Sequence, residues 1–256
     1  MADLVYPPVI AACKLWFKAT GMHVVVRGTE HLPRTGGAVI ASNHVSYLDF
    51  IFAGLASVQV GRLTRFMAKD AVFRNKVSGP LMRGMSHIPV DRDAGSASFR
   101  AALKALKAGE LVGIFPEATI SRSFTVKELK SGAARLAQAA GVPLVPVAVW
   151  GGQRMFTKNH PKALFSRGRH VFVQVGEPVD APRQADAEAT TAALRASLQS
   201  MLEQLQRSTP EQPSAGEDAW WHPAHLGGSA PTPEQAAVMD AEQRQARRRA
   251  SGSSSD

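Results

Sequence analysis

The sequence contains one cysteine, Cys13, among its 256 residues. A single thiol excludes an internal disulfide and any metal site built from several cysteines. No run of 18 or more apolar residues occurs, which argues against a transmembrane helix. The N-terminus also lacks signal-peptide features, because it carries Asp3, has no early basic region, and has Lys14 within its apolar run.

Acidic residues are scarce in the first half of the chain. Residues 1–135 hold 18 Lys and Arg against 9 Asp and Glu, whereas residues 136–256 hold 12 of each. The segment 60–83 alone has six basic residues against one acid, Asp70. Such a localised positive charge suits nucleic acid, anionic lipid headgroups or phosphorylated substrates, and it also suits a solvated face without a ligand. Composition does not decide among these.

The remaining composition is that of a globular protein. Hydrophobic residues make up 45% and charged residues 20%, and the length suits one sizeable domain. Short β-rich runs alternate with helical ones, which predicts a single-domain α/β fold with a central mixed, mostly parallel sheet flanked by helices. The expected strands are 23–27, 38–42, 65–68, 87–90, 111–115, 144–149 and 171–175. The expected helices are 46–57, 96–108, 131–140, 186–206 and 234–249.

Three regions are expected along the chain. Residues 1–21 predict an amphipathic helix, beginning near Pro8, whose apolar face carries Trp16 and Phe17 and either contacts a membrane surface or packs on the core. Residues 22–207 form the main domain. Residues 208–256 are a C-terminal extension that we expect to dock in part, through the apolar segment 220–223, and to end in a disordered tail.

The sharpest local motif is Asn-His-Val-Ser-Tyr-Leu-Asp at residues 43–49, directly after an expected strand. Residues five apart lie about 140° from each other on a helix and do not meet there. His44 and Asp49 can meet if His44 lies in a turn, Ser46 caps the following helix, and Asp49 lies in its first turn. Asp49 would then orient an imidazole that acts as a general base. Alternatively, Asp49 only caps the helix.

Three further segments follow this motif in order. They are Gly-Met-Ser-His-Ile-Pro-Val-Asp-Arg at 84–92, Ile-Phe-Pro-Glu-Ala-Thr at 114–119 and Val-Pro-Leu-Val-Pro-Val-Ala at 142–148. With the motif at 43–49, they resemble the four sequence blocks of the glycerophospholipid acyltransferase family, over about residues 28–150. Within that family the chain is most similar to the bacterial 1-acyl-sn-glycerol-3-phosphate acyltransferases of actinobacterial type.

The resemblance implies a reaction and a site. His44, oriented by Asp49, would remove the proton from the hydroxyl of a lysophosphatidic acid-like acceptor, 1-acyl-sn-glycerol 3-phosphate. The donor thioester is acyl-CoA or acyl carrier protein, and the product is phosphatidic acid. No bound cofactor and no metal are expected, and the protein should bind an anionic membrane surface peripherally at the cytoplasmic face of the cell membrane. The residues implied to bind substrate are Lys69, Arg92, Glu117, Thr119, Ser121 and Arg122.

The third block departs from the family pattern, which reads Phe-Pro-Glu-Gly-Thr-Arg-Ser. Ala118 replaces the glycine, which makes a positive φ there less favourable. Ile120 replaces the arginine, and Arg122, two residues later, is the candidate to supply the missing charge from a rearranged loop.

Other functions stay open from the sequence. The motifs do not separate 1-acyl-sn-glycerol 3-phosphate from glycerol 3-phosphate, another lysophospholipid or a glycolipid as acceptor. A nucleic-acid-binding module is disfavoured, because segment 60–83 has few aromatic residues for base stacking and no known binding motif. A non-catalytic lipid-binding protein is disfavoured by the intact His44 and Asp49.

Overall fold

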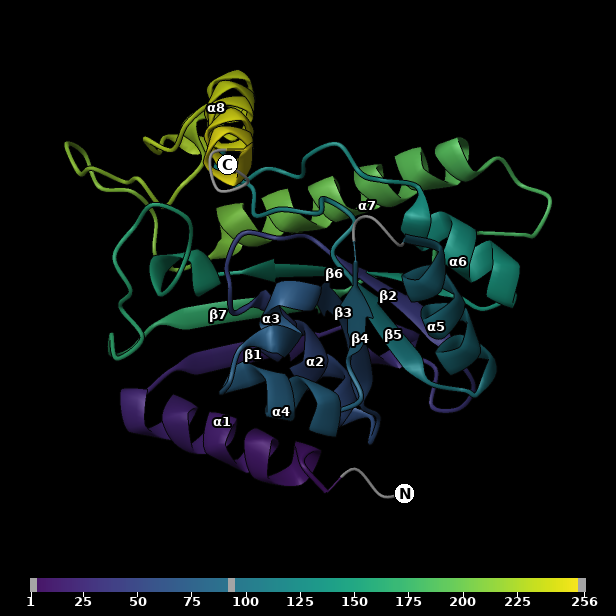
Figure 1. Cartoon of the computed structure of the whole chain (residues 1–256). Helices are drawn as coiled ribbons and strands as arrows, with labels where there is room; N and C mark the ends of the chain where they lie inside the picture. Colours follow the sequence, from purple (N-terminus) through teal and green to yellow (C-terminus); the bar gives the residue numbers. More distant parts are fainter. Residues whose placement is uncertain (1–3, 92–94, 253–256) are drawn as a thin grey trace.

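The computed structural model describes residues 4–91 and 95–252. It is a three-layer α/β structure in which helices cover both faces of one seven-stranded sheet (Figure 1). The strands are β1 (His23–Arg27), β2 (Ala38–Ser42), β3 (Thr64–Lys69), β4 (Ile88–Val90), β5 (Leu111–Ile114), β6 (Leu144–Trp150) and β7 (His170–Val175). The predicted fold class, a single α/β domain with a mixed sheet, is confirmed.

The strand order is β1-β7-β6-β2-β5-β3-β4. All neighbours are parallel except β6 and β7, which pair antiparallel from Val147–Val175 to Trp150–Phe172. β2, β5 and β6 lie inside the sheet and are buried along nearly their whole length. Continuous apolar runs, rather than alternating ones, are what strands covered on both faces require.

Each face of the sheet has its own core. One face packs against α5 (Gly95–Lys107), α6 (Gly132–Ala140) and α7 (Ala187–Ser208), where Leu194, Leu198 and Leu202 are fully buried. The other face packs against α1 (Tyr6–Thr20) and α2 (Asp49–Gln59), where Phe17 stacks on Phe52 at 5.8 Å between ring centroids. The sheet is therefore shielded from water on both sides.

The expected elements all form, with small shifts at their ends, but the start of α2 was predicted wrongly. The helix begins at Asp49 rather than Ser46. Two short helices, α3 (Asp70–Arg74) and α4 (Ser78–Gly84), were not predicted. They are too short to show a helical period in the sequence, and burial of Phe73 and Met82 holds them on the domain.

The predicted apolar face of the N-terminal helix is turned toward the protein. Phe17 is buried, and Trp16 packs beside it and donates from its ring Nε1 to the carbonyl of Leu164 at 2.9 Å. Leu15, which is 68% exposed, points away from the core. Among the described residues, no helix combines the length and apolar character needed to cross a membrane.

The C-terminal extension lies against the domain. Trp221 and His222 are buried, and His222 packs edge-on against Trp150 with 6.0 Å between ring centroids. The chain then forms α8 (Pro233–Gly252), seen as the yellow helix of Figure 1. Its buried residues, Ala236 and Asp240, face the loop that follows β5.

Candidate active site

The motif residues gather at one edge of the sheet. β2, β3, β4 and β5 are parallel, so their carboxyl ends reach the same edge. His44 follows β2, Lys69 ends β3, Asp91 follows β4, and Glu117 follows β5. In open α/β sheets this edge is where ligands bind. Residues far apart in the sequence are thus brought to one place by topology.

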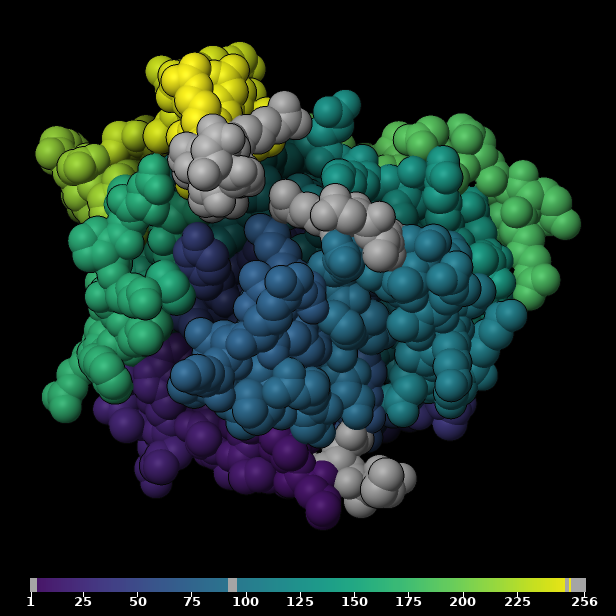
Figure 2. All heavy atoms as spheres, viewed as in Figure 1, coloured from purple at the N-terminus to yellow at the C-terminus, as the bar shows by residue number. Residues whose placement is uncertain are grey.

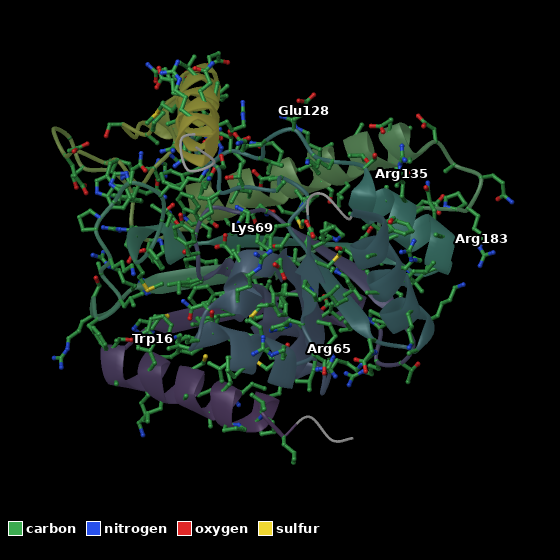
Figure 3. The ribbon with its side chains drawn as sticks, viewed as in Figure 1. Trp16, Arg65, Lys69, Glu128, Arg135 and Arg183 are labelled. Atoms are coloured by element: carbon green, nitrogen blue, oxygen red, sulfur yellow. The ribbon has the colours of Figure 1, made fainter. Side chains whose placement is uncertain are left out.

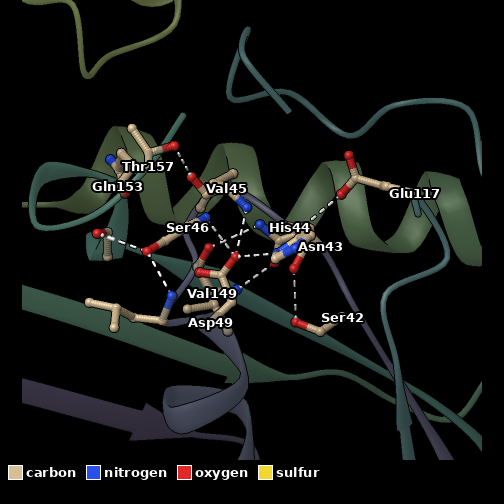
Figure 4. Close-up of polar contacts among 12 residues, drawn as sticks. Ser42, Asn43, His44, Val45, Ser46, Asp49, Glu117, Val149, Gln153 and Thr157 are labelled. Carbon is tan, nitrogen blue, oxygen red and sulfur yellow. Dashed lines mark hydrogen bonds and ion pairs between the residues drawn. The ribbon is translucent and has the colours of Figure 1, made fainter. Parts of the chain in front are cut away.

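The His44–Asp49 pair forms as predicted from the motif. The imidazole Nδ1 of His44 lies 3.0 Å from Oδ2 of Asp49 (Figure 4). The same Oδ2 accepts the backbone N–H groups of Val45 and Ser46, each at 2.7 Å. The carboxylate therefore fixes the turn and the imidazole with one oxygen.

The protonation pattern follows from these contacts. Asp49 is fully buried, and burial raises the pKa of its carboxyl, while the bonds from His44, Ser46 and Val45 oppose that rise. An oxygen that already accepts two N–H groups receives a third hydrogen from Nδ1 of His44. In the neutral imidazole, Nε2 then has the free lone pair and can accept a proton.

The His44 ring is held on its flat side as well. It stacks on Phe115 with 4.4 Å between ring centroids, and Phe115 in turn stacks on Phe66 at 5.9 Å. The His44 side chain is 20% exposed, and in the part of the chain that the structure describes its Nε2 has no hydrogen-bond partner. An oriented, partly exposed imidazole of this kind can act as a general base.

Two polar side chains position the turn without facing the site. Asn43 is buried and exchanges two hydrogen bonds with the backbone of Val149, at 3.0 and 2.7 Å, which ties the end of β2 to β6. The Ser46 hydroxyl donates toward the carbonyls of Gly152 (3.0 Å) and Phe156 (2.7 Å). Ser46 was expected to cap α2. Its hydroxyl oxygen does accept the N–H of Leu48 at 3.1 Å, but this bond closes a turn before the helix, which begins only at Asp49.

Glu117 is a buried link between backbone segments. Its Oε1 accepts the N–H of His44 at 2.7 Å, and its Oε2 accepts the N–H of Lys127 at 3.1 Å. Burial raises the pKa of this carboxyl to about 8, although the two N–H bonds oppose the rise. The resemblance implies that Glu117 binds substrate; in the structure each of its oxygens accepts a backbone N–H of the protein.

The other predicted binding residues differ in accessibility. Lys69 is exposed at the end of β3, near the centre of Figure 3, and Thr119 is half-buried. Ser121 is buried and donates its N–H to the carbonyl of His44 at 2.7 Å. Arg92 lies outside the described residues. Arg122 is buried and pairs with Asp240 of α8.

The structure thus brings His44, Asp49, Glu117 and Ser121 together, while Arg122 turns to another partner. Sequence reasoning missed Asn43, Thr157, Lys158 and Asp240. The Thr157 hydroxyl donates to the carbonyl of Val45 at 2.8 Å. Asn43 precedes the histidine directly and could have been noticed, but nothing local marks the other three.

The third-block loop adopts the backbone that its family glycine would favour. Ala118 has φ = +59°, in the left-handed region. For a residue with a Cβ this conformation costs about 1–2 kcal/mol. The loop therefore carries strain at the position where this sequence departs from the family pattern.

Replacing Ala118 by glycine should stabilise the fold. We expect Ala118→Gly to raise the free energy of unfolding by about 0.5–1 kcal/mol, the relieved strain less the extra entropy of an unfolded glycine. The matched control is Ala192→Gly on the exposed face of α7, which should lower it by about 1 kcal/mol. Urea denaturation measures both, and a destabilised Ala118→Gly protein would contradict the strain at this residue.

The buried carboxyl of Glu117 should make stability depend on pH. Its pKa rises from 4.5 to about 8 on folding. Between these values the folded state holds one proton more than the unfolded state, so stability falls as pH rises, by up to about 1.4 kcal/mol per pH unit. Urea denaturation between pH 5 and pH 8 measures how the free energy of unfolding changes with pH. For Glu117→Gln this change per pH unit should be smaller by about that amount, because glutamine does not titrate. Equal slopes for the two proteins would refute the raised pKa.

Comparisons with known proteins bear on this geometry. The family model described as Acyltransferase matches residues 23–150, which contain all four motif segments. A 1-acyl-sn-glycerol-3-phosphate acyltransferase of Bacillus subtilis is 37% identical over 164 residues, covering 64% of this chain and 75% of that protein. One from Borreliella burgdorferi is 26% identical over 184 residues, covering 70% of each.

A solved structure shares the fold. The crystal structure of the 1-acyl-sn-glycerophosphate acyltransferase from Thermotoga maritima superposes with a TM-score of 0.62, at 22% identity, covering 80% of this chain and 82% of that one. The matched family model includes His44 and Asp49, and the similarity to the Bacillus protein extends over three quarters of that protein. The chain belongs to the acyltransferase family.

Proposed function

We propose that the protein transfers a fatty acyl chain from acyl-CoA or acyl carrier protein to the free hydroxyl of 1-acyl-sn-glycerol 3-phosphate, forming phosphatidic acid. The observation that carries the proposal is the His44–Asp49 hydrogen bond at the carboxyl edge of the sheet, with Nε2 left as the base. The names of the Bacillus and Borreliella relatives support the acceptor.

The chemical step follows from the orientation of the imidazole. Nε2 of His44 takes the proton of the acceptor hydroxyl while its oxygen attacks the thioester carbonyl carbon. The tetrahedral intermediate collapses, the C–S bond breaks, and the leaving thiolate takes the proton back from His44. Asp49 stabilises the imidazolium between the two transfers through the 3.0 Å bond to Nδ1. No covalent acyl-enzyme is involved.

The acyl chain has an apolar place to enter. A cavity between α1, α2 and β3 is lined mainly by apolar side chains, among them Ile10, Phe50, Leu55 and Phe66. Phe66 stacks on Phe115, the ring that packs against His44. The rings of Phe66 and Phe115 thus lie between this cavity and His44, and we assign the cavity to a fatty acyl chain.

The acceptor phosphate needs cations at the same edge. Lys69 ends β3 there, and Arg92 directly follows Asp91 at the end of β4, so we assign the phosphate to this pair. An arginine can hold a phosphate through two parallel N–H bonds. Thr119 supplies a hydroxyl on the neighbouring loop. Arg122 is left out of this set, since its guanidinium is buried against Asp240.

Membrane contact fits the α3–α4 surface better than α1. Its exposed apolar side chains are those of Val72, Val77 and Leu81, and its exposed basic residues include Arg74 and Lys76. Figure 2 shows this mid-blue surface on the same face as the dark blue segment that leads into α2. Apolar tips with a basic rim complement an anionic bilayer. We therefore place this surface on the cytoplasmic face of the cell membrane.

Loss of the base should abolish transfer without unfolding the protein. His44→Ala should lower kcat by about a hundred- to ten-thousand-fold, the usual contribution of general-base catalysis. The matched control, His225→Ala, replaces an exposed histidine of the C-terminal extension and should keep full activity. Release of free thiol from acyl-CoA and from acyl carrier protein measures the rate.

The same assay tests the acceptor. The panel contains 1-acyl-sn-glycerol 3-phosphate, glycerol 3-phosphate, a lysophospholipid with a neutral headgroup, and a glycolipid. We expect the highest kcat/KM with the first. A preference for another acceptor would overturn the proposed substrate, and full activity of His44→Ala would overturn the mechanism.

The α3–α4 surface should carry membrane binding. Val77 is 77% exposed, and Val77→Ser should weaken binding to phosphatidylglycerol vesicles by about tenfold, because burying a valine contributes about 1.5 kcal/mol or more. Val238→Ser, at a 59% exposed valine of α8, is the control. Leu15→Ser tests α1 without disturbing its packed face. If only Leu15→Ser weakens vesicle flotation, the contact lies on α1 instead.

A further inference from the structure

A buried carboxylate of α8 joins three cations from two different loops. Asp240 accepts hydrogen bonds from Nε of Arg122 at 3.0 Å and from Nζ of Lys158 at 3.1 Å, and it also pairs with Nζ of Lys127. We call these four residues the Asp240 cluster. Asp240 and Arg122 are buried, with side chains 5% and 6% exposed, and the side chain of the half-buried Lys158 is 9% exposed.

The first loop, residues 115–127, holds the histidine segment from one side. It supplies Arg122 and Lys127 to the cluster. The N–H of Ser121 in the same loop donates to the carbonyl of His44 at 2.7 Å. The N–H of Lys127 binds the carboxyl of Glu117, which accepts the N–H of His44. Both polar groups of the His44 backbone therefore depend on the placement of this loop.

The second loop, residues 151–163, holds the same segment from the other side. It supplies Lys158 to the cluster. The adjacent Thr157 hydroxyl donates to the carbonyl of Val45, and the carbonyl of Phe156 accepts both the hydroxyl of Ser46 and the N–H of Tyr47. Residues 45–47 are thus bound to a loop that α8 also binds.

The first loop needs support from outside. Two of its residues that carry a Cβ, Ala118 and Phe124, have φ values of +59° and +56°. Such conformations persist where surrounding contacts fix them. Arg122 lies between the two, and its guanidinium binds Asp240 and, at 3.3 Å, Oε1 of Gln243. α8 therefore supplies part of the force that keeps this loop in place.

From these contacts we propose that Asp240 is a positioning residue of the acyltransferase site: its carboxylate holds the two loops that fix the backbone of His44 from either side. The proposal rests on the function proposed above. Lys158 and Asp240 both lie beyond residues 23–150, the part that the family model matches. The C-terminal extension is in this view a working part of the enzyme rather than an appendage.

Asp240 keeps its negative charge over the physiological pH range. Burial acts to raise the pKa of Asp240, but the hydrogen bonds from Lys127, Arg122 and Lys158 outweigh it and bring the pKa to about 2. The Asp240 carboxylate thus stays ionised beside its three basic partners. Neutralising Asp240 leaves three neighbouring cations without a counter-charge, so the two loops should separate.

The test compares Asp240→Asn, Asp240→Glu and the control Asp218→Asn in the full chain. Asp218 is exposed on the same extension and contacts Ser229. We expect Asp240→Asn to lower kcat by about a hundredfold, the scale of a 1 Å misplacement of a catalytic group, with the acceptor KM changed less than threefold. Asp240→Glu should recover most of the activity, and Asp218→Asn should match the wild type.

A structural role alone would give a different result. Circular dichroism at the assay temperature gives the folded fraction, and kcat is expressed per folded molecule. Wild-type kcat per folded Asp240→Asn molecule would overturn the proposal. A raised acceptor KM at unchanged kcat would also overturn it, because the cluster would then bind substrate. In a folded Asp240→Asn protein we also expect the NMR signals of the His44 ring to shift, and unshifted signals would count against the proposal.

The outcome stays separate from that of the proposed function. If the wild-type protein transfers no acyl group to any acceptor of the panel, the proposed function fails. If the wild type is active and His44→Ala is not, while Asp240→Asn keeps full kcat, the proposed function stands and the positioning role fails.

Discussion

One carboxylate oxygen organises the site. Oδ2 of Asp49 receives the imidazole of His44 and two backbone N–H groups, and all three bonds lie within 3.0 Å. Because Asp49 is the first residue of α2, the orientation of the histidine is tied to the helix that covers one face of the sheet. The same oxygen orients the ring and holds the turn that carries it. The geometry of the His44–Asp49 pair and the start of α2 are therefore one structural feature.

Further polar contacts connect the turn around His44 to more distant parts of the chain. Asn43 fixes the turn to β6, Glu117 and Ser121 fix it to the loop after β5, and Thr157 fixes it to the loop after β6. Each partner is buried, so each bond is protected from competing water. The departure from the family pattern at Ile120 is accommodated within this arrangement, since Ile120 is buried and Arg122 turns toward α8.

The sequence predicted correctly those features that depend on neighbouring residues alone. Strands such as β2 are continuous apolar runs, and their bounds could be read from the sequence; the motif at 43–49 identified the histidine and its acid. The start of α2 was missed because the N–H groups of Val45 and Ser46 bind the Asp49 carboxylate in a turn, so the helix begins only at Asp49. The pairing of Arg122 with Asp240 could not be predicted, because Asp240 lies in a polar helix that carries no motif. Long-range pairing of charged groups leaves no period or spacing to detect.

The position of Asp240 also has a consequence for synthesis. The carboxylate that joins the two loops is made long after His44, and at 5–20 residues per second a ribosome needs about 10–40 s to travel between them. Until then the loops after β5 and β6 present Arg122, Lys127 and Lys158 without their common acid. A nascent chain that has already folded its sheet therefore still lacks the Asp240 contacts, which form only after α8 has been made.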